Sequence, residues 1–98
     1  MEKRKPHYDL AAVKTVVLQR GADAFTATAL VGAQAMGLDS VQAIGVVCAM
    51  TRADFYKSMT THAASQVWQD VYHPAAPNGK VAYVKVTLSV DGSIVIQF

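Results

Sequence analysis

Lys80–Phe98 reads KVAYVKVTLSVDGSIVIQF, and this stretch decides the fold. Apolar and polar residues alternate along it with the two-residue period of a half-buried β-strand. In the first strand the apolar face consists of Ala82, Val84, Val86, Leu88 and Val90, and the opposite face consists of Tyr83, Lys85, Thr87 and Ser89. In the last strand the two faces are Ile94, Ile96 and Phe98 against Ser93, Val95 and Gln97. The stretch therefore predicts two paired strands that keep Tyr83 and Lys85 away from the core.

The register of these two strands follows from the turn between them. A two-residue turn at Asp91 and Gly92 would pair Val86 with Gln97 and so mix an apolar face with a polar one. A three-residue turn at Val90–Gly92, with Gly92 in the left-handed conformation, sets the apolar faces side by side. We therefore expect Val84, Val86 and Leu88 beside Phe98, Ile96 and Ile94. The same register places Gln97 next to Lys85.

A third strand is predicted ahead of this pair. Gln66–His73 is rich in strand-forming residues. Trp68 and Tyr72 fall on one face, Gln69 and Val71 fall on the other, and the sequence leaves open which face is buried. The following segment, 74–79, contains two prolines and a glycine and is typical of a loop.

Two helices are predicted in the first part of the chain, after a charged arm at residues 1–7. The first begins near Tyr8, has apolar residues close to helical spacing, and stops at Gly21. The second begins at Thr26 or Thr28, either of which can accept a hydrogen bond from a free backbone N–H, and ends at Gly37.

A third helix is capped by Asp39 or Ser40 and is apolar nearly all round, which predicts the most buried element of the fold. Thr51 and Asp54 then resemble a capping box and predict a further turn through Tyr56. Three helices followed by antiparallel strands indicate an α+β fold, with the helices on one face of a C-terminal sheet. At 98 residues the chain is expected to form one domain, 1–98.

Composition narrows the class of protein. Hydrophobic residues make up 52% and charged residues 16%, which is typical of a globular protein. The net charge of +2 is already supplied by the basic arm, so any attraction for nucleic acid must come from a local patch. Cys48 is the only cysteine, which excludes an intramolecular disulfide and argues against a zinc framework. Without a signal peptide or an apolar stretch of about 20 residues, we expect a cytoplasmic protein with no membrane contact.

Two segments in the middle of the chain carry a resemblance. Phe55–Thr61 reads FYKSMTT and Trp68–Tyr72 reads WQDVY, and in this order they closely resemble the MqsR family of toxin endoribonucleases. This family is the toxin half of the bacterial MqsR and MqsA toxin–antitoxin pair. The resemblance covers essentially the whole chain through Met1–Arg4, Pro6–His7, Gly37–Asp39 and the last two strands.

The resemblance implies a RelE-like fold of the small α+β ribonucleases, in agreement with the order of predicted elements. It implies single-stranded mRNA as substrate and an MqsA-like antitoxin as protein partner, with zinc and a DNA-binding module on the antitoxin. Contact with DNA is then only indirect, through the antitoxin. No cofactor and no metal are expected for the toxin itself.

Cleavage of RNA without a metal needs help for the attacking 2′-hydroxyl, cations near the phosphate and a donor for the leaving 5′-oxygen. On the family motif the catalytic positions fall on Lys57, Gln69 and Tyr83. Lys57 is placed where helical structure gives way to sheet, and its ammonium suits charge stabilisation better than proton abstraction. Gln69 is expected to hold a phosphate or ribose oxygen in line. Tyr83 is expected to donate to the leaving oxygen or contact the scissile phosphate, and the general base stays unassigned.

The auxiliary or RNA-binding candidates share an aromatic, imidazole or ammonium group: Tyr56, His62, His73, Lys80 and Lys85. Tyr56 can stack on a base. His62 directly follows the first motif and can assist proton transfer, whereas His73 has either such a role or only ends its strand. In the family pattern a basic residue follows the position of Phe98, and Lys85, Lys80 or the free C-terminal region would take its place here.

The function expected from this reading is a sequence-selective, ribosome-independent mRNA endoribonuclease that works by 2′-hydroxyl attack. The alternative is a catalytically weak or inactive module that binds an antitoxin and acts in transcriptional autoregulation. A DNA-binding regulator has little support, because no helix carries a basic recognition face. A serine hydrolase is disfavoured because no nucleophile-elbow glycines surround Ser58 or Ser65.

Overall fold

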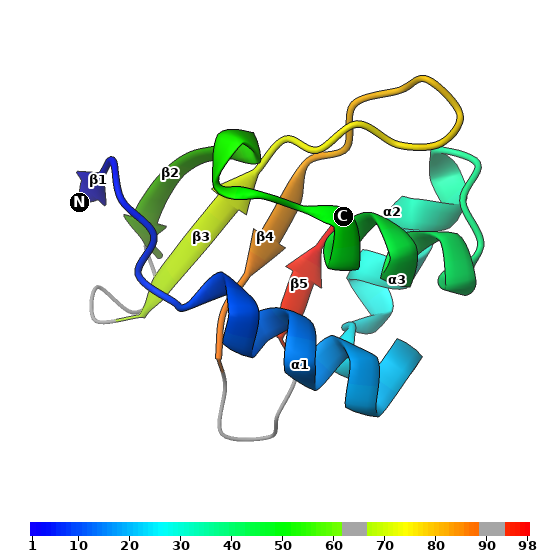
Figure 1. The fold of residues 1–98 in the computed structure, drawn as a ribbon, viewed down its shortest axis with the longest axis horizontal. Coiled ribbons are helices and arrows are strands. Elements are labelled where there is room, and N and C mark those ends of the chain that lie inside the picture. The colour runs from blue at the N-terminus through cyan, green and yellow to red at the C-terminus, as the bar shows by residue number, and fades with distance from the viewer. Residues whose placement is uncertain (62–66, 89–93) are drawn as a thin grey trace.

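The computed structural model describes residues 1–61, 67–88 and 94–98. Within these ranges the helices are α1 (Leu10–Arg20), α2 (Ala27–Ala35) and α3 (Ser40–Ala49), with short 3₁₀ helices at Gly21–Ala24 and Arg52–Asp54. The strands are β1 (Glu2–Lys3), β2 (Phe55–Thr60), β3 (Trp68–Tyr72), β4 (Val84–Val86) and β5 (Val95–Gln97) (Figure 1). The predicted α+β class, with helices ahead of an antiparallel sheet, is confirmed.

Side chains close in sequence fix the ends of the helices. Thr26 caps α2, since its Oγ1 accepts a hydrogen bond from the backbone N–H of Ala29 at 3.1 Å. Asp39 caps α3 in a capping box with Gln42. Gly37 follows α2 with a φ of 90°, a conformation that favours glycine and ends the helix as predicted.

The prediction that α3 is the most buried element is wrong, because only one face of this helix is buried whereas three of the five residues of β3 are. The inner face of α3 is buried through Ala43, Val46 and Val47, but Val41 is 74% exposed. The helix packs on the rest of the core through this single face. Apolar residues on the other side therefore meet solvent, which periodicity alone does not reveal.

In the described part of the chain, no single helix has the length and apolar content needed to cross a membrane. α2 and α3 pass that test only when taken together, and they meet at a bend of 97°.

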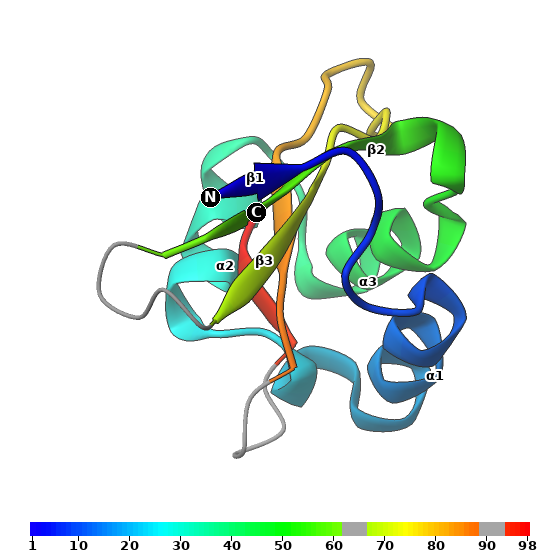
Figure 2. The same ribbon diagram turned by 90° about the vertical axis from the view of Figure 1, so that its left-hand side faces the viewer.

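Within the described residues the sheet is antiparallel with the order β1-β2-β3-β4-β5 (Figures 1 and 2). β1 and β2 were not predicted. The turn that begins at Thr51 ends at Asp54 instead of continuing through Tyr56, and β2 begins at the next residue. Lys57 therefore lies inside a strand and not at a helix-to-sheet junction. β2 forms because β1 and β3 pair with its two edges, a long-range contribution that is absent from the local pattern.

The predicted register of β4 and β5 is right at one position and wrong at the next. Lys85 pairs with Gln97 as expected, but the register then shifts and Val86 pairs with Val95 instead of Ile96. This irregularity brings Val95 into the core, although simple alternation placed it outside.

The predicted alternation of buried and exposed side chains is also wrong beyond β4. Thr87 is buried and Leu88 is 50% exposed, the reverse of the prediction. The hydroxyl of Thr87 donates to the carbonyl of Trp68 at 2.9 Å and lies 2.9 Å from the hydroxyl of Tyr8, so polar partners hold it inside. The predicted turn at Val90–Gly92 lies outside the described residues.

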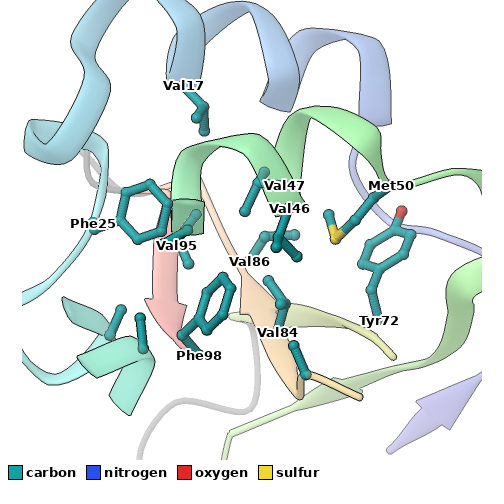
Figure 3. Packing of buried hydrophobic residues seen from close by; sticks show 14 of the residues in the cluster. Val17, Phe25, Val46, Val47, Met50, Tyr72, Val84, Val86, Val95 and Phe98 are labelled. Carbon is teal, nitrogen blue, oxygen red and sulfur yellow. The ribbon is translucent and has the colours of Figure 1, made fainter. Parts of the chain in front are cut away.

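The core lies between the sheet and the helices. Val17 of α1 and Val47 of α3 are buried over Val86 and its neighbours in the sheet (Figure 3). α2 lies beside β5 and approaches it closely: a Cβ added to Gly32 would be 2.7 Å from the carbonyl oxygen of Phe98. Only glycine permits this contact between helix and strand.

The segment before α2 lies along the outer edge of β5. Phe25 forms a parallel bridge with Val95. The N–H of Ile94 donates to the carbonyl of Ala24, and the N–H of Thr26 donates to the carbonyl of Val95, both at 2.9 Å. These two bonds pair backbone groups at the start of β5 that an edge strand would otherwise expose.

Candidate active site

A row of paired residues crosses the sheet on the face turned away from the core. Lys57 of β2 pairs with Val71 of β3, which pairs with Lys85 of β4. Paired residues project to the same face, and so does every second residue along a strand. We call this the outer face; of the predicted site residues it carries Lys57, Gln69, His73, Tyr83 and Lys85.

An irregularity in β2 adds Tyr56 to the outer face. The register between β2 and β3 shifts between Phe55 and Lys57, which leaves Tyr56 as the extra residue. The ring of Tyr56 stacks on that of His73, with centroids 4.7 Å apart and an interplanar angle of 21°. Bulges recur next to active sites because they re-aim a side chain. Here two consecutive side chains reach one face of the sheet.

His73 lies between two tyrosines. Its ring centroid is 4.7 Å from that of Tyr56 and 5.1 Å from that of Tyr83. The Nε2 atom of His73 is buried and has no hydrogen-bond partner among the described residues. Lys85 Nζ lies 5.6 Å from the centre of the Tyr83 ring. The stacked rings hold both phenols in place at a partly exposed surface.

Lys57 forms an ion pair with the carboxylate of Glu2, which β1 places on the same face. The hydrogen bond to Glu2 raises the pKa of Lys57 above its usual value, against the opposing effect of desolvation, and the charge of Glu2 and the phenols of Tyr56 and Tyr83 add to the rise. The same hydrogen bond holds the pKa of Glu2 below its usual value. Lys57 is therefore an ammonium at neutral pH, within electrostatic reach of both tyrosines.

Two of the predicted residues, Gln69 and Lys80, stand apart from this cluster. Gln69 is half-buried on the outer face, diagonal to Lys57 across β2 and β3, a geometry in which Cβ atoms are about 7 Å apart. Lys80 is exposed in the loop between β3 and β4, away from the paired strands. His62 lies outside the described residues.

Two residues that matter for the geometry were missed in the sequence. One is Glu2, which looked like part of a charged arm. The other is Asp70, fully buried on the opposite side of β3, whose carboxylate accepts hydrogen bonds from the N–H groups of His7 and Tyr8 at 2.8–3.0 Å and from Ser58 Oγ at 2.6 Å. Asp70 thus ties the arm to the sheet. A pairing between residues this far apart leaves no signal in local pattern.

Within residues 1–61, 67–88 and 94–98, no three His, Cys, Asp or Glu side chains gather in a way that could hold a metal ion. The polar groups that do gather on the outer face are an ammonium, two phenols, an imidazole and a carboxylate. Such groups can hold a phosphate, stabilise negative charge on it and transfer protons.

Comparison with known proteins gives two matches. The model of a family described as "Motility quorum-sensing regulator, toxin of MqsA" matches residues 5–98. The chain is also 43% identical over 95 residues to a protein of Escherichia coli (strain K12) named "mRNA interferase toxin MqsR", and the match covers 97% of this chain and 95% of that protein.

Proposed function

The chain belongs to the MqsR toxin family and is an endoribonuclease of that family, and we propose that it cuts mRNA sequence-selectively, without the ribosome, by attack of the 2′-hydroxyl on the adjacent phosphorus. The products are a 2′,3′-cyclic phosphate, or the 3′-phosphate formed from it, and a free 5′-hydroxyl. One observation carries this proposal: the ammonium of Lys57 and the phenol of Tyr83 share one face of the sheet within electrostatic reach.

Each group then has a role in the reaction. Lys57 donates to the non-bridging oxygens and stabilises the charge that grows there as the phosphorane forms. Tyr83 gives its phenolic proton to the leaving 5′-oxygen, and Lys85 beside its ring favours the resulting phenolate. Gln69 holds a ribose or phosphate oxygen in line with the leaving group. Tyr56, 43% exposed, offers a ring for a base of the substrate.

The proposed partner is an MqsA-like antitoxin that neutralises the toxin and brings the DNA-binding module. The toxin would then affect transcription only through that complex, in the cytoplasm, where its mRNA substrate is made. The family description, which names the toxin of MqsA, supports this pairing.

Primer extension on a defined transcript tests the activity. Wild-type protein should cut at discrete sites, whereas Lys57→Ala and Tyr83→Phe should slow cutting by about 10²–10³-fold, the usual effect of losing a charge stabiliser or a general acid. Lys14→Ala is the matched control, because it removes an ammonium from α1 on the other side of the sheet. Intact RNA with the wild type, or equal rates for wild type and Lys57→Ala, would show that catalysis is assigned wrongly.

A further inference from the structure

The site described so far lacks a proton acceptor for the attacking 2′-hydroxyl. Lys57 is an ammonium whose pKa is raised, so it holds its proton at neutral pH. The amide of Gln69 is not a base, and the phenol of Tyr83 already serves as the proton donor to the leaving oxygen. A reaction that begins with removal of a proton needs one more group on this face.

Glu2 supplies a carboxylate at the required place. It pairs with Met59 across β1 and β2 and so projects to the outer face together with Lys57. Its side chain is 57% exposed, which leaves it open to a bound substrate. None of the other described carboxylates shares this position: Asp9, Asp23 and Asp39 lie at helix starts, Asp54 bonds to the backbone of Thr51, and Asp70 is buried behind β3.

The backbone around Glu2 is held on both sides, so its position is built into the fold. The N–H of Thr60 donates to the carbonyl of Met1 at 3.0 Å, and the terminal ammonium of Met1 donates to Thr60 Oγ1 at 3.2 Å. After β1, Arg52 Nη2 donates to the carbonyl of Arg4 at 3.2 Å. A two-residue strand at a chain end would fray without these contacts.

Resting on the proposed ribonuclease function, we propose that Glu2 is the general base of the reaction. Its carboxylate takes the proton of the 2′-hydroxyl, and the oxygen uses the freed electron pair to form a bond to phosphorus. The bond from phosphorus to the 5′-oxygen then breaks, and that oxygen keeps the electron pair and receives the proton of Tyr83. Lys57 has three N–H donors and can bond to Glu2 and to the phosphate at the same time.

The groups that face Glu2 are all cations: Lys57 of β2, Arg4 of the arm and the terminal ammonium. They favour the ionised carboxylate, which lowers the pKa of Glu2, and they shield it from the phosphate charge. His73 is the rival acceptor on this face. Its Nε2 is buried and its ring is packed between two tyrosines, which disfavours it as the proton acceptor.

Single-turnover cleavage of an oligoribonucleotide that contains one cut site tests the proposal. Glu2→Gln keeps an acceptor for Lys57 but removes the base, and it should lower the rate by about 10²–10⁴-fold. The fall in wild-type rate at acidic pH should disappear in this variant. Asp23→Asn is the matched control, because it removes one exposed carboxylate far from the outer face and should keep the wild-type rate.

A second substrate, with sulfur in place of the leaving 5′-oxygen, separates the two proton transfers. A thiolate leaves without protonation, so Tyr83→Phe should recover its rate on this substrate while Glu2→Gln should stay slow. Binding of an uncleavable 2′-deoxy analogue should be unchanged or tighter in Glu2→Gln. A residue that only positioned Lys57 would instead weaken that binding.

The outcomes are distinguishable. If the wild type does not cleave RNA, the proposed function fails and this inference fails with it. If the wild type cleaves but Glu2→Gln stays within about threefold of it or keeps the acidic fall in rate, Glu2 is not the base. Recovery of Glu2→Gln on the sulfur substrate would also overturn the proposal, and a wild-type melting temperature for the variant excludes misfolding as the cause.

Discussion

Replacement of Asp70 tests how the arm is attached to the sheet. Asp70 is fully buried, and its two oxygens accept hydrogen bonds from the N–H groups of His7 and Tyr8 and from the hydroxyl of Ser58. No basic side chain pairs with it among the described residues, where the N–H groups of His7 and Tyr8 and the hydroxyl of Ser58 bind its carboxyl oxygens. Removing the acceptor therefore acts on several buried donors together.

The two variants of Asp70 should differ in cost. Asp70→Ala leaves two N–H groups without an acceptor, which costs roughly 1–3 kcal/mol for each buried donor. Ser58 keeps a weaker hydrogen bond to the carbonyl of Gln69. We therefore expect the free energy of unfolding to fall by about 3–4 kcal/mol. In Asp70→Asn the remaining oxygen still accepts from Tyr8, and the hydroxyl of Ser58 can reverse its role and accept from the amide. That variant should lose only about 1–2 kcal/mol.

Denaturant unfolding measures these losses, and amide hydrogen exchange measures where they act. The N–H of Thr60 bonds to the carbonyl of Met1, so it should exchange faster in Asp70→Ala as β1 detaches, even under conditions where the core stays folded. Ser58→Ala is the matched control, because it removes one donor and leaves the arm attached. A loss below about 1 kcal/mol for Asp70→Ala, or unchanged exchange at Thr60, would refute this account of the attachment.

Two further predictions concern packing and pH. Gly32→Ala should destabilise the fold by about 1–3 kcal/mol, because its Cβ would be 2.7 Å from the carbonyl oxygen of Phe98. Gly45→Ala should be neutral or stabilising, because no atom lies within 4 Å of the added Cβ. Thermal melts of the two variants test this difference. The pair of Glu2 and Lys57 should stabilise fully near neutral pH. Because the pKa of Glu2 is lowered and that of Lys57 is raised, this contribution is lost as pH falls through the lowered value and as it rises through the raised one. Melting temperature against pH should therefore flatten at both ends in Glu2→Gln, and curves identical to the wild type would contradict this.

The features that were predictable depend on residues near one another in sequence. Thr26 and Asp39 each accept a hydrogen bond from an N–H group three residues away, and Gly37 ends α2 through its own backbone conformation. The features that were not predictable depend on pairing between distant strands. β2 is a strand because of its neighbours, and the register shift after Lys85 reverses the faces that alternation assigned to Val95.

The candidate site likewise has a part that was predictable from the sequence and a part that was not. Alternation placed Tyr83 and Lys85 on one face, and the position of Lys85 Nζ, 5.6 Å from the centre of the Tyr83 ring, agrees. The face of Lys57 depends on the extra residue in β2, and its partner Glu2 lies 55 residues away, so neither could be found by periodicity. The roles of Lys57, Gln69 and Tyr83 came from the family motif and stay predictions until the variants are measured.

The segment that runs beside β5 has a consequence for self-association. With Phe25 bridged to Val95, one margin of the sheet offers no free backbone groups to another molecule along that bridge. The opposite margin, β1, is two residues long and carries Glu2 and Lys3, so it presents charges of both signs and little length for a foreign strand to match. These two features disfavour stacking into fibrils, because the bridge to Phe25 covers part of one margin and the two-residue β1 offers little length to template growth at the other.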